Sequence, residues 1–307
     1  YHALPPLTRK SDGLPIGAVS GFCNMLSKLV DDVRDAGEVD YFAVIFDAAR
    51  KTFRNDIYPE YKANRPPAPE DLVPQFPLVK RASEAFNLAT IEMPGFEADD
   101  IIATYARQAR EAGMAVTIVS SDKDLMQLVG GSVVMQDPMK QRLIGPDQVQ
   151  EKFGVGPDRV IDVQALCGDA TDNVPGVPGI GIKTAALLIN EYGDLDGVLE
   201  RAEEIKQPKR RQSLIEHADL ARVSRQLVTL KEDVPLDLSL EDLRMREPDG
   251  DVLLGFMAEM GLERLAGRIA QRLGGREPAV DTTADTAPAA AVERDYQCIQ
   301  SLGELEQ

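Results

Sequence analysis

Apolar positions recur at helical spacing near the start of the chain and then change to the pattern of a buried strand. Between residues 18 and 33 an apolar side chain recurs every three or four positions, and Gly37 follows as a stop signal. The run 41–46 is continuously apolar and rich in β-forming residues. It predicts a strand buried on both faces, which ends at Asp47.

The same two patterns alternate through the first half of the chain. Apolar runs predict strands at 88–93 and 115–120, whereas helical spacing predicts a helix over 98–112 and a helical turn over 124–129. This alternation is typical of an α/β fold with a parallel sheet, in which ligands lie outside the carboxyl ends of the strands. We therefore expect functional side chains directly after the strands.

The second half of the chain changes character from about residue 157. Helical patterns over 159–166, 184–192 and 209–230 predict a helical second domain, and the stretch 276–291 has almost no large apolar residue, which is typical of a flexible linker. We assign an α/β domain to residues 1–155, a helical domain to 156–272, a linker to 273–291 and the start of a further domain to 292–307.

Composition limits the chemistry that the chain can perform. The 307 residues include 51 Asp and Glu against 34 Lys and Arg, so the formal net charge is −17. The two histidines lie far apart and the three cysteines form no CxxC pair, which disfavours zinc or Ser/His catalysis and suits a reducing, cytoplasmic compartment. No apolar stretch is long enough to span a membrane. Carboxylates are therefore the abundant reactive groups.

Eight of these carboxylates are predicted to meet at one edge of the sheet. Each motif alone could be an ordinary helix cap or turn, but together they would repel one another strongly unless hard divalent ions were bound, of which Mg²⁺ is the natural choice. Two such ions permit hydrolysis of a phosphodiester without histidine. The eight are Asp47, Glu97, Asp99, Asp100, Asp122, Asp124, Asp169 and Asp172.

A glycine-rich segment between residues 176 and 184 precedes an apolar-periodic helix. Gly179 and Gly181 would let the backbone approach a phosphate, and Lys183 and the neighbouring Thr184 lie at the same end of that helix. The segment has the form of the hairpin in a helix-hairpin-helix element, which binds duplex DNA through its phosphates. The alternative is a tight connection between helices with a capping glycine.

The segment 50–65 is basic inside an acidic protein. It has five Lys and Arg residues against two acids, and aromatic residues alternate with them, a composition suited to single-stranded nucleic acid. A solvated basic loop is the alternative. The candidate DNA contacts here are Arg54, Tyr61, Lys62 and Arg65.

Five sequence blocks, in a fixed order, resemble the 5′-nuclease domain of bacterial DNA polymerase I, a member of the flap endonuclease superfamily. They are VIFDA with KTFR, YKANRPPAPEDL, GFEADDIIATYA, SSDKDLMQLV and GDATDNVPGVPGIGIKTA, and the likeness runs from residue 1 to about residue 271. The resemblance implies a PIN-like, parallel-sheet nuclease domain followed by a helical helix-hairpin-helix domain.

The resemblance also implies an activity and its partners. The activity is removal of 5′ flaps and 5′-terminal nucleotides at nicks and single-strand/duplex junctions, including RNA primers, during replication and repair, by a monomer that uses two or more Mg²⁺ ions, with Mn²⁺ able to substitute. The eight acids match the family's metal-binding acids one by one. Lys62 and Arg65 match catalytic basic residues of an arch over the site, with Lys62 helping to neutralise the scissile phosphate. The hairpin is expected to hold a K⁺ ion.

The two ends of the chain extend this interpretation. The family begins with a hydrophobic strand ending in V-D-G, so about twenty residues are expected to precede residue 1, whereas 296–307 resemble the opening of a proofreading-like domain. We therefore expect part of a DNA polymerase I associated with the bacterial nucleoid. The alternatives are a free-standing 5′-to-3′ exonuclease, a DNA-junction binding module without catalysis, and a phosphohydrolase acting on small molecules.

Overall fold

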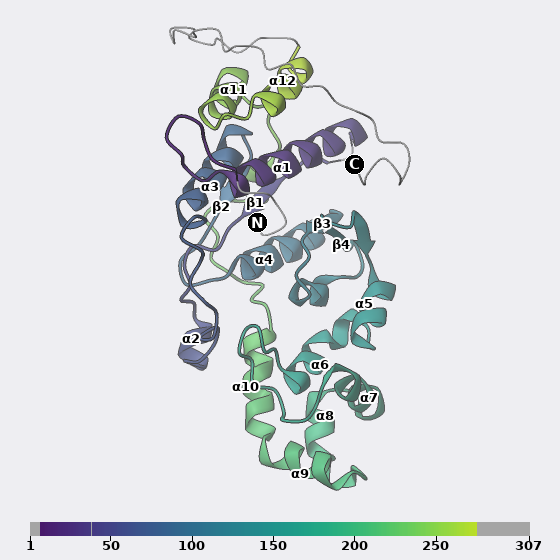
Figure 1. Cartoon of the computed structure of the whole chain (residues 1–307). Helices are drawn as coiled ribbons and strands as arrows, with labels where there is room; N and C mark the ends of the chain where they lie inside the picture. Colours follow the sequence, from purple (N-terminus) through teal and green to yellow (C-terminus); the bar gives the residue numbers. More distant parts are fainter. Residues whose placement is uncertain (1–6, 38, 275–307) are drawn as a thin grey trace, which may run out of the picture.

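The computed structural model describes residues 7–37 and 39–274. Figure 1 shows an elongated molecule with helices at both ends and strands between them. The predicted start of a further domain (292–307) lies outside the described residues, and so does the predicted linker (273–291) beyond Gly274. In the part of the chain that the structure describes, no helix is long and apolar enough to cross a membrane.

The strands form two small sheets. In one, β1 and β2 pair in parallel with Ala43 opposite Ala89. In the other, β3 and β4 pair in parallel with Val116 opposite Val133, and β5 adds an antiparallel edge. The strands are β1 (Ala43–Ile45), β2 (Ala89–Ile91), β3 (Val116–Val119), β4 (Val133–Asp137) and β5 (Arg142–Ile144).

The predicted α/β class with parallel strand pairs is confirmed, with two differences in detail. All three residues of β1 are only half-buried, so the prediction of a strand buried on both faces was wrong, and β1 pairs with β2 alone. The hairpin of β4 and β5 was missed. It adds an antiparallel pair to what we expected to be an all-parallel sheet.

Helix α4 (Ala98–Glu111) lies between the two sheets (Figure 1) and packs against both. Its Ile101 and Tyr105 contact the core beside β1 and β2, while Ala103 and Ala106 contact the core beneath β3 and β4. The start of α4 is therefore held beside the carboxyl ends of both parallel pairs.

Four helices form the end of the molecule drawn uppermost in Figure 1. Val19 and Leu26 of the first helix share a core with Leu253 and Met257, near the other end of the described chain. The last two helices of the predicted helical domain 156–272 therefore pack on the α/β half and not on the other helices of that predicted domain. The four are α1 (Gly17–Ala36), α3 (Phe76–Ala85), α11 (Gly250–Glu259) and α12 (Glu263–Arg272).

The remaining helices form the opposite end, below β3 and β4. The single helix predicted over 209–230 is broken at His217, whose backbone (φ −116°, ψ 23°) leaves the helical region. The helices here are α5 (Pro146–Phe153), α6 (Val160–Cys167), α7 (Ile182–Tyr192), α8 (Leu195–Glu200), α9 (Pro208–Glu216) and α10 (Ala218–Val228). Short turns elsewhere are α2 (Arg54–Ile57) and the 3₁₀ segments η1 (Val73–Gln75), η2 (Asp124–Leu128), η3 (Pro157–Arg159), η4 (Ala202–Glu204) and η5 (Leu240–Leu243).

Candidate active site

Five carboxylates gather where β1 and β3 end and α4 begins. Asp47 comes two residues after β1, and its Oδ1 accepts a 2.7 Å hydrogen bond from the backbone N–H of Ala98 in the first turn of α4. This contact joins the carboxyl end of β1 to the start of α4. We call the following five residues the acidic cluster: Asp47, Glu97, Asp99, Asp122 and Asp124.

The pKa of Asp99 is raised by its surroundings in the acidic cluster. Burial raises this pKa most, and the charges of the other four acids raise it further, to about 8. Burial and the charge of Asp122 raise the pKa of Asp124 to about 6, whereas a 2.6 Å hydrogen bond from Gln164 Nε2 opposes that rise. A bound cation would relieve this repulsion. Gln164 was not singled out from the sequence, because a glutamine inside an apolar helix has no signal of its own.

Asp100 does not belong to the acidic cluster. It is fully buried, and each of its carboxylate oxygens accepts a 2.7 Å hydrogen bond from the guanidinium of Arg54. Backbone N–H groups of Lys231 and Glu97 donate to the same carboxylate at 2.9 and 3.1 Å. The prediction of Asp100 as a direct metal ligand is therefore corrected, because its oxygens face internal donors.

The DNA contact predicted for Arg54 is corrected for the same reason. Arg54 is 1% exposed, and besides Asp100 it donates to the carbonyl oxygens of Leu227 (2.7 Å) and Thr229 (3.2 Å) at the end of α10. Helix α10 packs against α2, which carries Arg54, and the guanidinium is buried between the end of α10 and Asp100 of α4. Its role in this structure is to join three segments of the chain.

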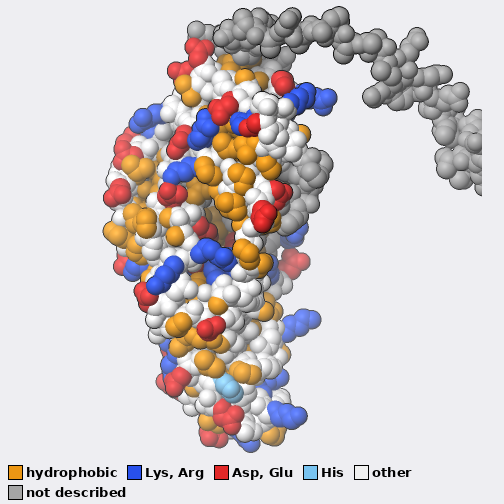
Figure 2. Space-filling view, turned by 60° about the vertical axis from the view of Figure 1, so that its left-hand side comes forward, with side chains coloured by type: hydrophobic (Ala, Val, Ile, Leu, Met, Phe, Trp, Pro, Cys, Tyr) orange, Lys and Arg blue, Asp and Glu red, His pale blue; other side chains and the backbone are white. Residues whose placement is uncertain are grey.

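Lys62 and Arg65 lie beside the acidic cluster, as predicted. Lys62 Nζ is 2.9 Å from Glu97 Oε2 and 3.6 Å from Asp172 Oδ2, and the guanidinium of Arg65 pairs with Asp172. Figure 2 shows a hollow near the middle of the displayed face with Lys and Arg side chains along its lower rim. The two cations thus bridge the start of α4 and the loop that carries Asp172.

Backbone and amide contacts fix the basic segment on that loop. The N–H of Lys62 donates to the carbonyl of Asp172 at 2.9 Å, Asn64 Nδ2 donates to Ala170 O at 2.7 Å, and Asn173 Nδ2 donates to Glu60 O at 2.6 Å. Lys62 adopts φ +56°, a conformation uncommon for a non-glycine residue. These contacts hold the backbone of Lys62 in place, so that its side chain lies beside the carboxylates of Glu97 and Asp172.

Tyr61 is buried rather than presented to solvent. It is 5% exposed, packs against Val174 and Leu227, and donates a 3.2 Å hydrogen bond to Glu97 Oε2. Burial and the charge of Glu97 raise the pKa of its phenol. The base contact predicted for Tyr61 is therefore corrected, because its ring has no open face on which a base could stack.

Asp169 and Asp172 lie on a tight loop after α6. Asp169 and Val174 exchange backbone hydrogen bonds of 2.9 and 2.8 Å, and Asp169 pairs with Lys123, which had not been assigned a role. A Cβ at Gly176 would lie 2.4 Å from the backbone nitrogen of Gly168, so the loop closes only with glycine at 176. Both predicted acids are thus near the site but already paired with cations of the chain.

In residues 7–37 and 39–274, no three carboxylate, His or Cys side chains converge closely enough to hold a metal ion as the structure stands. The donor set nevertheless fits a hard divalent cation. The acidic cluster offers only carboxylate oxygens, and burial together with the charges of the other four acids raises the pKa of Asp99.

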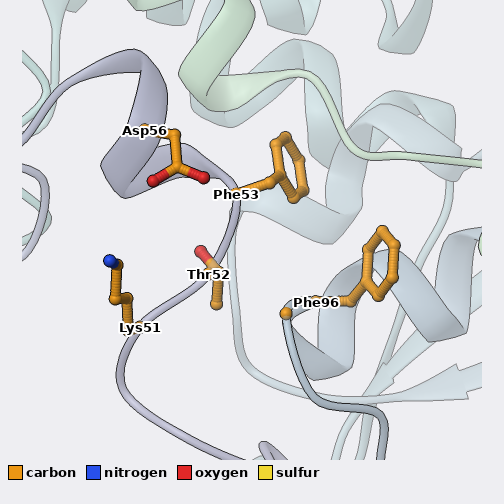
Figure 3. A pocket seen from close by; sticks show the side chains of 6 residues that line it. Lys51, Thr52, Phe53, Asp56 and Phe96 are labelled. Carbon is orange, nitrogen blue, oxygen red and sulfur yellow. The ribbon is translucent and has the colours of Figure 1, made fainter.

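A cavity of about 380 Å³ opens beside the acidic cluster, between the segment after β1 and the loop before α4. Figure 3 shows Lys51 and Asp56 on one side of it and the rings of Phe53 and Phe96 on the other. The ring centroids are 6.0 Å apart, and Phe96 directly precedes Glu97. This ring pair therefore helps to hold the start of α4 against the end of β1.

The hairpin predicted to bind DNA has the expected form. Gly179, Gly181 and Lys183 are exposed, Thr184 lies in the first turn of α7, and Gly181 is the residue directly before that helix. Gly181 has no positive φ, and an added Cβ would meet nothing within 4 Å. Internal packing therefore does not require glycine at 181, and open space lies in front of it.

Comparison with known proteins agrees with this geometry. Residues 1–154 match the family described as 5′-3′ exonuclease, N-terminal resolvase-like domain, and residues 155–251 match 5′-3′ exonuclease, C-terminal SAM fold. A 5′-3′ exonuclease of Aquifex aeolicus is 38% identical over 86% of this chain and 89% of that protein.

A DNA polymerase I of Rhizobium leguminosarum is 60% identical over 88% of this chain, which covers 27% of that protein. The chain thus spans about a quarter of the length of this relative. Among solved structures, the flap endonuclease of bacteriophage T5, in a pseudo-enzyme–product complex with DNA and metal ions, has a TM-score of 0.60 at 23% identity, over 81% of this chain and 90% of that one. This likeness concerns the fold.

Proposed function

The chain belongs to the 5′-3′ exonuclease family, and from that premise we propose that it is a nuclease that hydrolyses phosphodiesters at the 5′ flaps and 5′ ends of DNA with bound Mg²⁺. The acidic cluster is the observation that carries this proposal. It presents five carboxylates at the carboxyl ends of parallel strands, where α/β proteins bind their ligands.

The acidic cluster would hold the metal ions, with Asp169 and Asp172 completing the site from the opposite loop. Bound Mg²⁺ or Mn²⁺ supplies an activated water and stabilises charge on the phosphate. Gln164 orients Asp124 through its 2.6 Å hydrogen bond. The Arg54–Asp100 pair fixes the first turn of α4, from which Glu97 and Asp99 project.

Besides the metal ions, Lys62 and Arg65 would provide positive charge at the active site. Both pair with carboxylates in this structure and lie where a substrate phosphate would approach the acids. Exchange of a carboxylate partner for a phosphate would place Lys62 against the scissile group. This agrees with the arch role that the sequence blocks imply.

The hairpin before α7 would hold the duplex part of the substrate. Its exposed glycines and Lys183 offer backbone N–H groups and one cation to phosphates, without contact to base edges. A K⁺ ion at the hairpin belongs to this proposal. The substrates are flaps, nicks and junctions, including RNA primers on DNA, and we expect the protein to act as a monomer in the bacterial cytoplasm.

The 60% sequence identity with the DNA polymerase I of Rhizobium leguminosarum supports the interpretation that this nuclease is part of a DNA polymerase I. The free-standing exonuclease of Aquifex aeolicus supports the alternative of a separate enzyme. The chemistry at the acidic cluster is the same in both cases.

Cleavage of a labelled 5′-flap DNA tests the proposal. The unmodified protein should cut near the junction with Mg²⁺ but not with EDTA. In EDTA, Asp122→Ala should bind the flap DNA as the unmodified protein does, and in Mg²⁺ it should not cut it, whereas Asp219→Ala, at an exposed acid on α10, should cut normally. A protein that binds the flap but never cuts it would favour the DNA-junction binding module without catalysis.

A further inference from the structure

A basic surface lies at the start of α9, outside the site described above. Four cations gather there in an acidic protein, and none of them forms an ion pair with a carboxylate of the described residues, although most Lys and Arg side chains elsewhere in that part do. The side chains of Arg210 and Arg211 donate to neutral groups, Arg210 to Gln207 Oε1 and Arg211 to the carbonyl of Ile205, each at 3.4 Å. The four are Lys206, Lys209, Arg210 and Arg211.

The position of these cations is unfavourable for the helix itself. Lys209 and Arg210 are in the first turn of α9, which has no acidic residue, although the helix dipole favours acids there. The neighbouring η4 contacts α9 and carries Glu203 and Glu204, but among the described residues neither acid forms an ion pair with these cations. A local arrangement that opposes helix stability without an internal compensation is expected at a functional surface.

The basic end of α9 is joined to the DNA-binding hairpin. Ser213 Oγ donates a 2.7 Å hydrogen bond to the carbonyl of Pro178, one residue before Gly179. Lys209 and Arg210 precede Ser213 by four and three residues, so they share its face about 6 and 4.5 Å further along the helix axis. Figure 1 shows α9 at the end of the molecule that also carries α7 and α8. The hairpin and the basic end of α9 thus form one continuous surface.

We propose that Lys209 and Arg210 bind phosphates of the same DNA duplex that the hairpin holds. The inference rests on the proposed function and extends its duplex-binding surface from α7 to α9. A DNA backbone fits this surface because its charge repeats at a regular spacing, and because neither the hairpin nor these flexible side chains require a particular sequence.

The salt dependence of duplex binding tests the proposal. A double variant, Lys209→Gln with Arg210→Gln, removes the exposed cation of Lys209 and the half-buried cation of Arg210 without disturbing an ion pair of the described residues. Each lost phosphate contact reduces the slope of log affinity against log salt by about 0.9, so the slope should fall by about 1.8. Between about 50 and 200 mM salt, the variant should lose about 12-fold less affinity than the unmodified protein.

The matched control has the same change of charge on the next helix. Arg222→Gln with Arg225→Gln removes two cations of α10 that are paired with Asp219 and Asp196, each at 2.8 Å. Binding of a blunt duplex is measured in EDTA, and flap cleavage in Mg²⁺ is measured in parallel. The control variant should keep the slope of the unmodified protein.

The outcomes separate this inference from the function on which it rests. If the unmodified protein binds and cuts DNA but the α9 variant keeps its slope, the α9 surface does not contact the duplex. An equal loss of slope in the control would show an effect of net charge and would also overturn the inference. If the unmodified protein neither binds nor cuts DNA, the proposed function itself fails.

Discussion

Replacing Arg54 tests whether the buried pair with Asp100 holds the site together. Arg54→Met keeps most of the side-chain volume but removes the guanidinium, leaving the carboxylate of Asp100 fully buried with only two backbone donors. Breaking a buried pair by removing one partner costs about 3–5 kcal/mol. The variant also loses the 2.7 Å bond to Leu227 O. We therefore expect the free energy of unfolding to fall by at least about 3 kcal/mol.

Urea unfolding measures the loss of stability in Arg54→Met, and a variant of an exposed ion pair serves as the matched control. Arg222 pairs with Asp219 at 2.8 Å, but these side chains are 50% and 99% exposed, so Arg222→Met should cost less than about 1 kcal/mol. A second variant, Arg54→Met with Asp100→Leu, removes both charges. It should unfold at a higher urea concentration than Arg54→Met alone, because no unpaired charge is then buried.

Two results would refute this reasoning. One is a cost for Arg54→Met no larger than that for Arg222→Met. The other is a decrease in the salt slope of DNA binding by the folded Arg54→Met protein, because that would mean Arg54 contacts phosphate as its sequence context suggested. An unchanged slope with a large loss of stability is the expected combination.

Three further predictions concern the site and the hairpin. Gln164→Leu should weaken Mn²⁺ binding about 10-fold by isothermal titration, because the hydrogen bond that orients Asp124 is lost, and unchanged affinity would contradict that role. Gly176→Ala should lower the thermal unfolding temperature, since its Cβ would meet backbone at 2.4 Å, whereas Gly181→Ala should unfold normally but bind duplex more weakly. Lys183→Ala should weaken binding of duplexes of different sequence equally, and a sequence-dependent loss would argue against phosphate contact.

Local sequence signals correctly predicted the features that depend only on residues close by in the chain. The helix stop at Gly37 appears as a left-handed residue after α1, and the acids placed after predicted strands do lie at the ends of β1 and β3. These features depend on neighbours a few residues apart. The break at His217 was not visible, because the apolar spacing continues across it from α9 into α10.

The errors at the site share one physical origin. Arg54 and Tyr61 occur in a basic segment with aromatic residues, a composition that predicts a surface for nucleic acid. Both side chains are nevertheless buried against the end of α10. Asp100 differs from its neighbour Asp99 by a rotation of one helical position, which turns it from the acidic cluster to Arg54. Partners distant in the sequence decide these environments, from Arg54 and Asp100, which are 46 residues apart, to Arg54 and Leu227, which are 173 apart, and composition carries no information about such pairs.

The charge balance around the site connects these observations. Glu97, Asp169 and Asp172 are paired with cations of the chain, through Lys62, Arg65 and Lys123. Asp100 is paired with Arg54, and in the part of the chain that the structure describes the other four of the eight acids have no ion-pair partner. Bound divalent cations would favour the charged forms of these four, against the burial and repulsion that raise the pKa values of Asp99 and Asp124. Lys62 and Arg65 reach a substrate phosphate only by leaving a carboxylate, so each carboxylate they leave adds to the charge that bound ions must balance. Binding of substrate and binding of metal should therefore strengthen one another. The four acids without an ion-pair partner are Asp47, Asp99, Asp122 and Asp124.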